Sequence, residues 1–318
     1  MNDTPLMFEV KNLSVQFSLN TPGRLFFSKS AVNALTKVSF NLKQGSTLGV
    51  VGESGSGKTT LARALVGLIT PTSGTISKAS HIVSRRDIQF VFQDPLAALN
   101  PKMTVAQLIL EPLEYVGTKP DSQNSEKKLK QVMQRVGLDY AQRHRYAHEF
   151  SGGQCQRIGI ARAMITEPKI LICDEPVSAL DVSIRAQIIN LLKDLQTHHG
   201  LTLIFIAHDL SLVRFISDKL IVLYQGQIME EGRTDAIFSH PGHPYTQALI
   251  SMEPKPDPIS ERQRQMMGSA GTEHAVNNEL ACAYASRCHF VQPQCGQSQP
   301  ELTRVNGAQN VACFYPLK

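Results

Sequence analysis

The segment GESGSGKT, residues 52–59, constrains the fold more than any other part of the chain. It directly follows a continuous apolar run, TLGVV, and precedes the helix-like pattern TLARALV. Such a glycine-rich turn between a strand and a helix lets successive backbone N–H groups point at phosphate oxygens, and its Lys58 and Thr59 would neutralise phosphate charge and bind magnesium. The alternative is a glycine-rich turn that arose by chance and binds nothing, but the strand before it and the helix after it argue against this alternative. The candidate phosphate ligands are Gly52, Ser54, Gly55, Gly57, Lys58, Thr59 and Thr60.

Two patterns of hydrophobic residues predict two kinds of sheet. Residues 8–19 and 32–42 alternate apolar with polar residues, which is typical of strands in a half-exposed antiparallel sheet. Continuous apolar runs indicate strands buried on both faces of a parallel sheet, and they occupy residues 47–51, 88–92, 170–173, 203–207 and 220–223. A more polar, helix-patterned insert spans about residues 100–162. The sequence therefore predicts an α/β fold with a parallel core sheet, an antiparallel β subdomain and a helical lobe.

Length and composition are those of an ordinary globular protein. With 318 residues and 42% hydrophobic content the chain can bury a large core, and its net charge of +5 includes no long basic run that would suggest nucleic-acid binding. Neither a signal peptide nor an apolar stretch long enough to cross a bilayer is found, so we expect a soluble protein that reaches a membrane through partners. The proline-rich stretch MEPKPDPIS predicts a boundary between a domain of residues 1–252 and an extension of residues 253–318.

Polar residues end several of the predicted buried strands. The stretch KILICDEP places Asp174 and Glu175 at the carboxyl end of one strand, where open α/β sheets bind their ligands. Asp174 is suited to hold magnesium and Glu175 to polarise an attacking water. Gln93 in FVFQDP and His208 in LIFIAHDL end two further strands and, taken alone, could be a surface glutamine and a loop histidine. Beside a phosphate loop, Gln93 becomes a candidate for the metal or the lytic water, and His208 for the γ-phosphate.

A second glycine-rich segment, SGGQ at residues 151–154, is predicted to begin a helix. Ser151 can cap that helix, and Gln154 can complete a capping box. Two glycines in a first helical turn lower helix stability, so another role must favour them. Bare amides at a helix start bind anions, although this chain already has a phosphate loop far upstream.

In chain order, GESGSGKT, Gln93, SGGQ, LICDEP, SALD and His208 resemble the nucleotide-binding subunits of ATP-binding cassette (ABC) transporters, over about residues 7–250. The resemblance implies an ATPase in which two chains hold ATP between them, so that the SGGQ segment of one chain contacts the nucleotide of the other. It also implies that Gln93 begins the surface that binds a transmembrane partner. The residues that it assigns to the contact between subunits are Ser151, Gly153, Gln154 and Asp181.

In ABC subunits an aromatic residue after the first strand usually stacks on adenine. Phe17 in LSVQF matches that position best, with Phe26 and Phe27 as alternatives. The chain departs from the family pattern in two places: Phe150 replaces the more common leucine before SGGQ, and the segment GTISKASHIVSRRDIQF is short. Neither departure changes a phosphate ligand, so we expect activity to be retained.

The cysteines narrow the resemblance further. Cys155 and Cys173 lie alone and are interpreted as small helix and strand residues. Four others crowd the C-terminal part, which, with HEFSGGQCQRIGIARA and GHPYTQAL, resembles the second ATPase subunit of oligopeptide and dipeptide importers. In that subfamily the four tail cysteines can hold a 4Fe-4S cluster, although four thiolates can also bind zinc or remain free. The cysteines in question are Cys282, Cys288, Cys295 and Cys313.

The resemblance predicts an ATP-hydrolysing, Mg²⁺-dependent subunit that energises peptide uptake, peripheral at the cytoplasmic face of a bacterial inner membrane. Expected partners are a homologous ATPase subunit, two transmembrane permease subunits and, indirectly, a substrate-binding protein; no nucleic acid is expected. The subfamily favours a heterodimer of ATPases and leaves a homodimer open. Alternatives are another cargo (nickel, glutathione or murein peptides), a soluble ABC ATPase acting on ribosomes or DNA, or a subunit that binds ATP without hydrolysis. Glu175 and His208 argue against the last.

Overall fold

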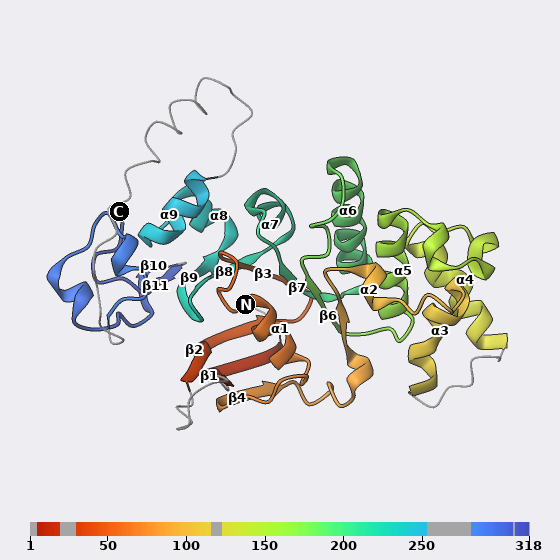
Figure 1. Ribbon diagram of the computed structural model, residues 1–318, viewed down its shortest axis with the longest axis horizontal. Helices are drawn as coiled ribbons and strands as arrows, with labels where there is room; N and C mark the ends of the chain where they lie inside the picture. Colours follow the sequence, from red (N-terminus) through yellow and green to blue (C-terminus); the bar gives the residue numbers. More distant parts are fainter. Residues whose placement is uncertain (1–4, 20–29, 116–122, 253–280, 308, 318) are drawn as a thin grey trace, which may run out of the picture.

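The computed structural model describes residues 5–19, 30–115, 123–252, 281–307 and 309–317, and an eight-stranded sheet runs through its centre (Figure 1). Across the sheet the strands are β10 (Thr303–Asn306), β11 (Gln309–Val311), β9 (Gln227–Arg233), β8 (Lys219–Tyr224), β3 (Thr47–Val51), β7 (Thr202–Ile206), β6 (Ile170–Asp174) and β5 (Ile88–Val91). The strands from β8 to β5 pair in parallel, and the others pair antiparallel. Each continuous apolar run therefore forms a parallel strand, as predicted.

A smaller antiparallel sheet packs against one face of this core. Its strands, in spatial order, are β2 (Ser30–Lys43), β1 (Leu6–Leu19) and β4 (Ser73–Lys78). β1 and β2 contain the two alternating segments, so that prediction is confirmed. The alternation arises because successive side chains of a strand point to opposite faces.

The same period of two divides the hydrophobic core into two clusters. In β7, Ile204 and Ile206 point to the cluster beneath the antiparallel sheet, whereas Leu203 and Phe205 point to the cluster that continues into the helical lobe. All four side chains are at most 1% exposed. Burial on both faces explains why these strands contain almost no polar residues and why their carboxyl ends occupy a fixed position.

Helices cover the sheet and extend beyond it. They are α1 (Lys58–Leu65), α2 (Pro95–Ala98), α3 (Val105–Tyr115), α4 (Gln123–Arg135), α5 (Gly152–Met164), α6 (Val182–His199), α7 (Leu210–Ile216), α8 (Thr234–Ser239) and α9 (Pro244–Ser251), with short 3-10 helices at Arg85–Asp87, Tyr140–His144, Ala147–Glu149, Ala285–Arg287 and Pro293–Gly296. In Figure 1, α3, α4 and α5 form a lobe at one end of the molecule, opposite the C-terminal segment. The insert predicted at about residues 100–162 is therefore helical.

Helix α5 begins as the sequence predicts. Ser151 Oγ accepts a hydrogen bond from the Gln154 N–H at 3.4 Å, and the Gln154 side chain accepts one from the Ser151 N–H at 3.0 Å. Cys155 in this helix and Cys173 in β6 are both 0% exposed. Burial raises the pKa of each thiol, so both are neutral packing residues, as interpreted.

The described part of the C-terminal segment, which starts at residue 281, is joined to the core sheet. β11 pairs with β9, and the Ala312 N–H donates to the Met229 carbonyl at 2.8 Å. Helix α9 ends at Ser251, and the predicted boundary falls against residues 253–280, which lie outside the described residues. The division at residue 252 stays a prediction. Within the described ranges, none of the helices combines the length and the apolar character that a bilayer crossing requires.

Candidate active site

The loop between β3 and α1 is shaped by two close backbone approaches. Gly57 caps α1 with a φ of 102°, and a Cβ there would strike the carbonyl oxygen of Ala34. At Gly52, a Cβ would overlap the carbonyl oxygen of Leu223, at the end of β8. Because only glycine fits at both points, the neighbouring strands hold GESGSGKT in the predicted tight turn.

Lys58 lies inside this loop. Its ammonium donates to the carbonyl oxygens of Gly52 at 2.7 Å and Glu53 at 2.8 Å, and the residue is 6% exposed. Burial lowers the pKa of Lys58, and the nearby carboxylates of Glu175 and Asp174 oppose that effect. A bound phosphate offers the ammonium a charged acceptor in place of neutral carbonyl groups, which strengthens the hydrogen bond.

Asp174 is the last residue of β6 and is 4% exposed. Its Oδ1 has no hydrogen-bond partner, whereas the Thr59 side chain hydrogen-bonds to the carboxylate. Burial raises the pKa of Asp174, and the hydrogen bond with Thr59 opposes this. A buried carboxylate with an unpaired oxygen, next to a hydroxyl, supplies the hard oxygen ligands that Mg²⁺ prefers. These residues therefore fit the predicted magnesium site.

The structure brings Gln93, Glu175 and His208 together. Gln93 Nε2 donates to Glu175 Oε2 at 3.1 Å, and His208 Nδ1 lies 3.3 Å from the same oxygen. Glu175 has a φ of 48°, an unfavourable conformation for a side chain of this kind, and its N–H bonds to the carbonyl of Ile206 in β7. Three separate strand ends thus deliver one glutamine, one carboxylate and one imidazole to a single point.

These side chains line one open cavity of about 1040 Å³ together with the phosphate loop. That is large enough for a nucleotide, since small-ligand sites measure about 300–1,000 Å³. Among the described lining residues, Glu175 is the single carboxylate. The predicted residues that line the cavity are Ser54, Gly55, Gly57, Lys58, Thr59, Thr60, Gln93, Glu175 and His208. Lining residues that the sequence did not single out are Val32, Asn33, Ala34, Thr36, Ser56, Gln225, Gln227 and Gln299.

The predicted adenine contact is less direct. Phe17 lies in β1 opposite Val32 of β2 and is 41% exposed. Val32 lines the cavity, whereas Phe17 is not among the described residues that do. Phe26 and Phe27 lie outside the described residues. Stacking of adenine on Phe17 therefore stays a prediction.

The SGGQ segment does not join the phosphate loop within one chain. Among the described residues, Ser151, Gly153 and Gln154 are absent from the lining of the cavity. Gly153 packs against α6 so closely that a Cβ would overlap the Ile184 side chain. Asp181 caps the same helix: its Oδ1 accepts from the Ile184 N–H at 3.0 Å, and this hydrogen bond is the main cause that lowers the pKa of Asp181. The close contact between α5 and α6 explains one of the two glycines without any ligand.

The four C-terminal cysteines line one small, enclosed pocket. The Cys282 N–H donates to the Cys295 carbonyl at 2.9 Å, which ties two of them together. Burial raises the pKa of Cys282 to about 11 and also raises the pKa values of Cys288 and Cys313. Within the described residues, however, no three cysteine, histidine or acidic side chains approach closely enough to hold a metal ion. The thiols converge without forming a metal site in this geometry.

The fold and the site together define a nucleotide-hydrolysing protein with a phosphate loop and a helical lobe. Comparisons with known proteins narrow this class. A family model described as "ABC transporter" matches residues 35–178, and one described as "Oligopeptide/dipeptide transporter, C-terminal region" matches residues 229–295.

Two relatives and one solved structure agree with these family matches. The oligopeptide transport ATP-binding protein OppF of Haemophilus influenzae is 46% identical, covering 98% of this chain and 98% of that protein. OppF of Salmonella typhimurium is also 46% identical, covering 93% of this chain and 92% of its own. The ATP-binding cassette MJ0796, solved as a dimer after hydrolysis with ADP and Pi, has a TM-score of 0.62 and 29% identity, covering 72% of this chain and 99% of that one. The chain belongs to the ABC transporter ATP-binding proteins, in the oligopeptide/dipeptide importer subfamily, and is an ATPase of that family.

Proposed function

We propose that this chain hydrolyses ATP to energise the uptake of oligopeptides through a bacterial membrane importer, as a peripheral subunit on the cytoplasmic face. The observation that carries the proposal is the convergence of Gln93 and His208 on Glu175 beside the phosphate loop. Oligopeptide cargo is supported by the near full-length similarity to OppF and by the match of the C-terminal region. No observation favours nickel, glutathione or murein peptides.

The phosphate loop and its neighbours bind the nucleotide. Backbone N–H groups of the loop and the Lys58 ammonium hold the β- and γ-phosphates. Thr59, Asp174 and Gln93 would hold Mg²⁺, whose positive charge would offset the negative charge on the phosphoryl oxygens. The unpaired Oδ1 of Asp174 supports this assignment.

Glu175 then activates the attacking water. Its carboxylate accepts a hydrogen bond from the water and orients it towards the γ-phosphorus. Gln93 and His208 both contact Oε2 of Glu175, which limits the rotation of the carboxylate. His208, with its side chain 58% exposed, is free to contact the γ-phosphate as well.

A complete site needs a second chain. The SGGQ helix start lies outside the phosphate-loop cavity of its own chain, yet the amides of Gly152 and Gly153 fall in the first turn of α5, where helices lack internal acceptors. The γ-phosphate of an ATP bound by a partner ATPase subunit is a fitting acceptor. ATP then joins the two chains, and its cleavage releases them. The subfamily favours a different chain as the partner.

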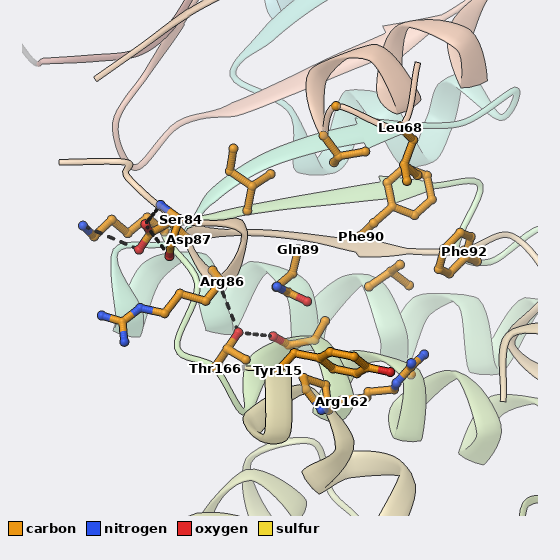
Figure 2. Close-up of a pocket in the computed structure, with 18 of the residues that line it drawn as sticks. Leu68, Ser84, Arg86, Asp87, Gln89, Phe90, Phe92, Tyr115, Arg162 and Thr166 are labelled. Carbon is orange, nitrogen blue, oxygen red and sulfur yellow. Dashed lines mark hydrogen bonds and ion pairs between the residues drawn. The ribbon is translucent and has the colours of Figure 1, made fainter. Parts of the chain in front are cut away.

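A groove beside Gln93 is suited to the permease. A cavity of about 1040 Å³ opens between β5, α2, α3 and α5, with Leu68, Phe90 and Phe92 on one side and Tyr115 on the other (Figure 2). Tyr115 is 84% exposed and Leu68 is 65% exposed. Because Phe92 directly precedes Gln93, a cytoplasmic segment of a permease subunit seated here would bear on the residue that contacts Glu175.

A buried polar side chain lies beside this groove. Gln156 of α5 lines it and is 1% exposed, yet neither its Nε2 nor its Oε1 has a hydrogen-bond partner. A buried amide without partners is costly, and both polar atoms are closed to solvent, so a docked segment would reach them only after neighbouring side chains move. We include two permease subunits, and a binding protein acting through them, among the partners because the chain belongs to the importer subfamily, and the groove supports contact with a permease segment.

The four C-terminal thiols are proposed to hold a 4Fe-4S cluster. Four soft ligands around one pocket support an iron-sulfur or a zinc centre. The described thiols would have to move closer together and lose their protons, which ligation to a metal favours. Anaerobic purification followed by iron, sulfide and zinc analysis decides between the cluster, zinc and free thiols.

The function is tested by reconstituting the chain with its copurifying membrane subunits in lipid vesicles. We expect ATP-dependent accumulation of a labelled tripeptide, and its loss in the Glu175→Gln variant. Labelled Ni²⁺ and glutathione, supplied in parallel, are expected to stay outside. Uptake of Ni²⁺ in place of peptide, or undiminished peptide uptake in the Glu175→Gln variant, would overturn the proposal.

A further inference from the structure

The C-terminal segment touches the phosphate loop directly. Arg287 Nη1 donates to Glu53 Oε2 at 2.8 Å, although the two residues are 234 positions apart. Glu53 is the second residue of GESGSGKT. Gln299, from the same C-terminal segment, lines the nucleotide cavity. The hydrolysis machinery described above uses neither of these C-terminal residues.

Glu53 is fixed through its backbone as well as its side chain. Its N–H donates to the Tyr245 hydroxyl at 3.0 Å, and its carbonyl accepts from the Lys58 ammonium at 2.8 Å and from the Ser56 N–H at 3.2 Å. The residue that pairs with Arg287 thus also supplies an acceptor to the phosphate-binding lysine. A displacement of Glu53 would change both the loop and the resting position of Lys58.

A buried aromatic cluster positions the Arg287 side chain next to Glu53. Tyr224 of β8, Tyr245 of α9 and Tyr284 of the C-terminal segment are at most 5% exposed, and their ring centroids lie 4.6 to 5.4 Å apart. The Arg287 guanidinium lies 6.0 Å from the Tyr224 ring and 5.8 Å from the Tyr284 ring, within reach of a cation–π contact. The aromatic cluster therefore joins the core sheet, α9 and the C-terminal segment at the point from which Arg287 reaches Glu53.

The one-turn helix that carries Arg287 is braced at both ends. The Ala285 N–H donates to the Cys282 carbonyl at 2.9 Å, and the Cys288 N–H donates to the Ala285 carbonyl at 3.3 Å. Cys282 and Cys288 both line the thiol pocket. The position of Arg287 consequently depends on how this part of the C-terminal segment is folded.

A carboxylate in a phosphate loop opposes the binding of polyphosphate unless a cation offsets it. We propose that Arg287 is a positioning residue of the nucleotide site: it neutralises Glu53 and fixes the phosphate loop, so that docking of the C-terminal segment sets the affinity for nucleotide. The role concerns binding, not the chemical step, and it adds to the proposed importer function without depending on the cargo.

Titration of full-length protein with ADP by calorimetry tests the proposal, because ADP fills the phosphate loop without being hydrolysed. Arg287→Ala is expected to raise the Kd about three- to tenfold, in the range set by one uncompensated charge near the surface, where tenfold corresponds to 1.4 kcal/mol. Arg287→Lys should recover part of this affinity, and the effect should shrink at high salt because the pair is partly exposed. Arg304→Ala, which removes the same charge from the same segment at β10, should leave the Kd unchanged.

A double variant of Glu53 and Arg287 shows whether the higher Kd of Arg287→Ala comes from the uncompensated charge of Glu53 or from a loosened C-terminal segment. Glu53→Gln should bind ADP at least as tightly as the wild type, and Glu53→Gln combined with Arg287→Ala should return the Kd to within about twofold of the wild type, since no charge is then uncompensated. An unchanged Kd in Arg287→Ala overturns the proposal. So does a double variant that binds as weakly as Arg287→Ala. Loss of ADP binding in Lys58→Ala, expected in any case, shows independently that the phosphate loop is the site measured.

Discussion

Replacing Glu175 by glutamine tests the assignment of the general base most sharply. The amide has the shape of the carboxylate, and its oxygen can still accept the hydrogen bond that Gln93 donates at 3.1 Å, so the local geometry is preserved. What is lost is the ability to take a proton from water. No other carboxylate is among the described residues that line the cavity, and the neighbouring Asp174 is 4% exposed and hydrogen-bonds with Thr59, so we expect no acidic side chain to take over the role.

The expected loss follows from this lack of a substitute. A positioned general base contributes about 10²–10⁴-fold to a rate, and each tenfold is about 1.4 kcal/mol of barrier. We therefore expect the kcat for ATP to fall by about two to four orders of magnitude while the Kd for ADP changes little, measured by phosphate release and calorimetry. Glu167→Gln, a matched change at an exposed carboxylate of the same chain, should keep full turnover. Turnover in Glu175→Gln within about threefold of the wild type would refute the assignment and point to His208 instead.

The remaining predictions concern stability. Gly153→Ala should lower the free energy of unfolding by about 1–3 kcal/mol in chemical denaturation, because its Cβ would overlap Ile184. In the same helix, the Cβ of Gly159→Ala meets open space, so this change should raise the free energy of unfolding by up to about 1 kcal/mol. Equal effects of the two variants would contradict the close packing at Gly153. Burial alone would raise the pKa of Asp87, but hydrogen bonds from the Ser84 and Val83 N–H groups hold it below 3.8. The folded state therefore binds fewer protons than the unfolded state near pH 3.8, so the stabilisation is full above that pH and is lost as pH falls through the lower folded value. Asp87→Asn should cost about 1 kcal/mol at pH 7, and the difference from the wild type should shrink below pH 3.8; a difference independent of pH would count against the charged cap.

Local patterns predicted the scaffold well because the physics that sets them is local. Period-two alternation in β1 and β2 and continuous burial in β3 and β7 are visible in the sequence, and so is the turn at residues 52–59. The proximity of Gln93, Glu175 and His208 could be predicted from the sequence, because parallel strands present their carboxyl ends at one edge of the sheet.

Contacts made across the fold left no such signal. Val32 lines the cavity because of the register between β1 and β2, and Gln299 because the C-terminal segment folds back to the phosphate loop. Residues adjacent in sequence determine neither position. The pairing of Arg287 with Glu53 joins residues 234 positions apart, in a C-terminal segment whose strand β11 pairs with β9. Conversely, the cysteine pattern predicts a metal centre that the described thiols, as they stand, are too far apart to form.

The central claim is that ATP is cleaved between two chains, each supplying its SGGQ helix start to the nucleotide of the other. Turnover per chain, measured over a wide range of protein concentration for this chain together with its partner ATPase subunit, tests it most directly. We expect turnover per chain to rise with concentration, to saturate as the chains pair, and to fall to background on dilution. Full turnover per chain at concentrations where analytical ultracentrifugation detects only monomers would contradict it.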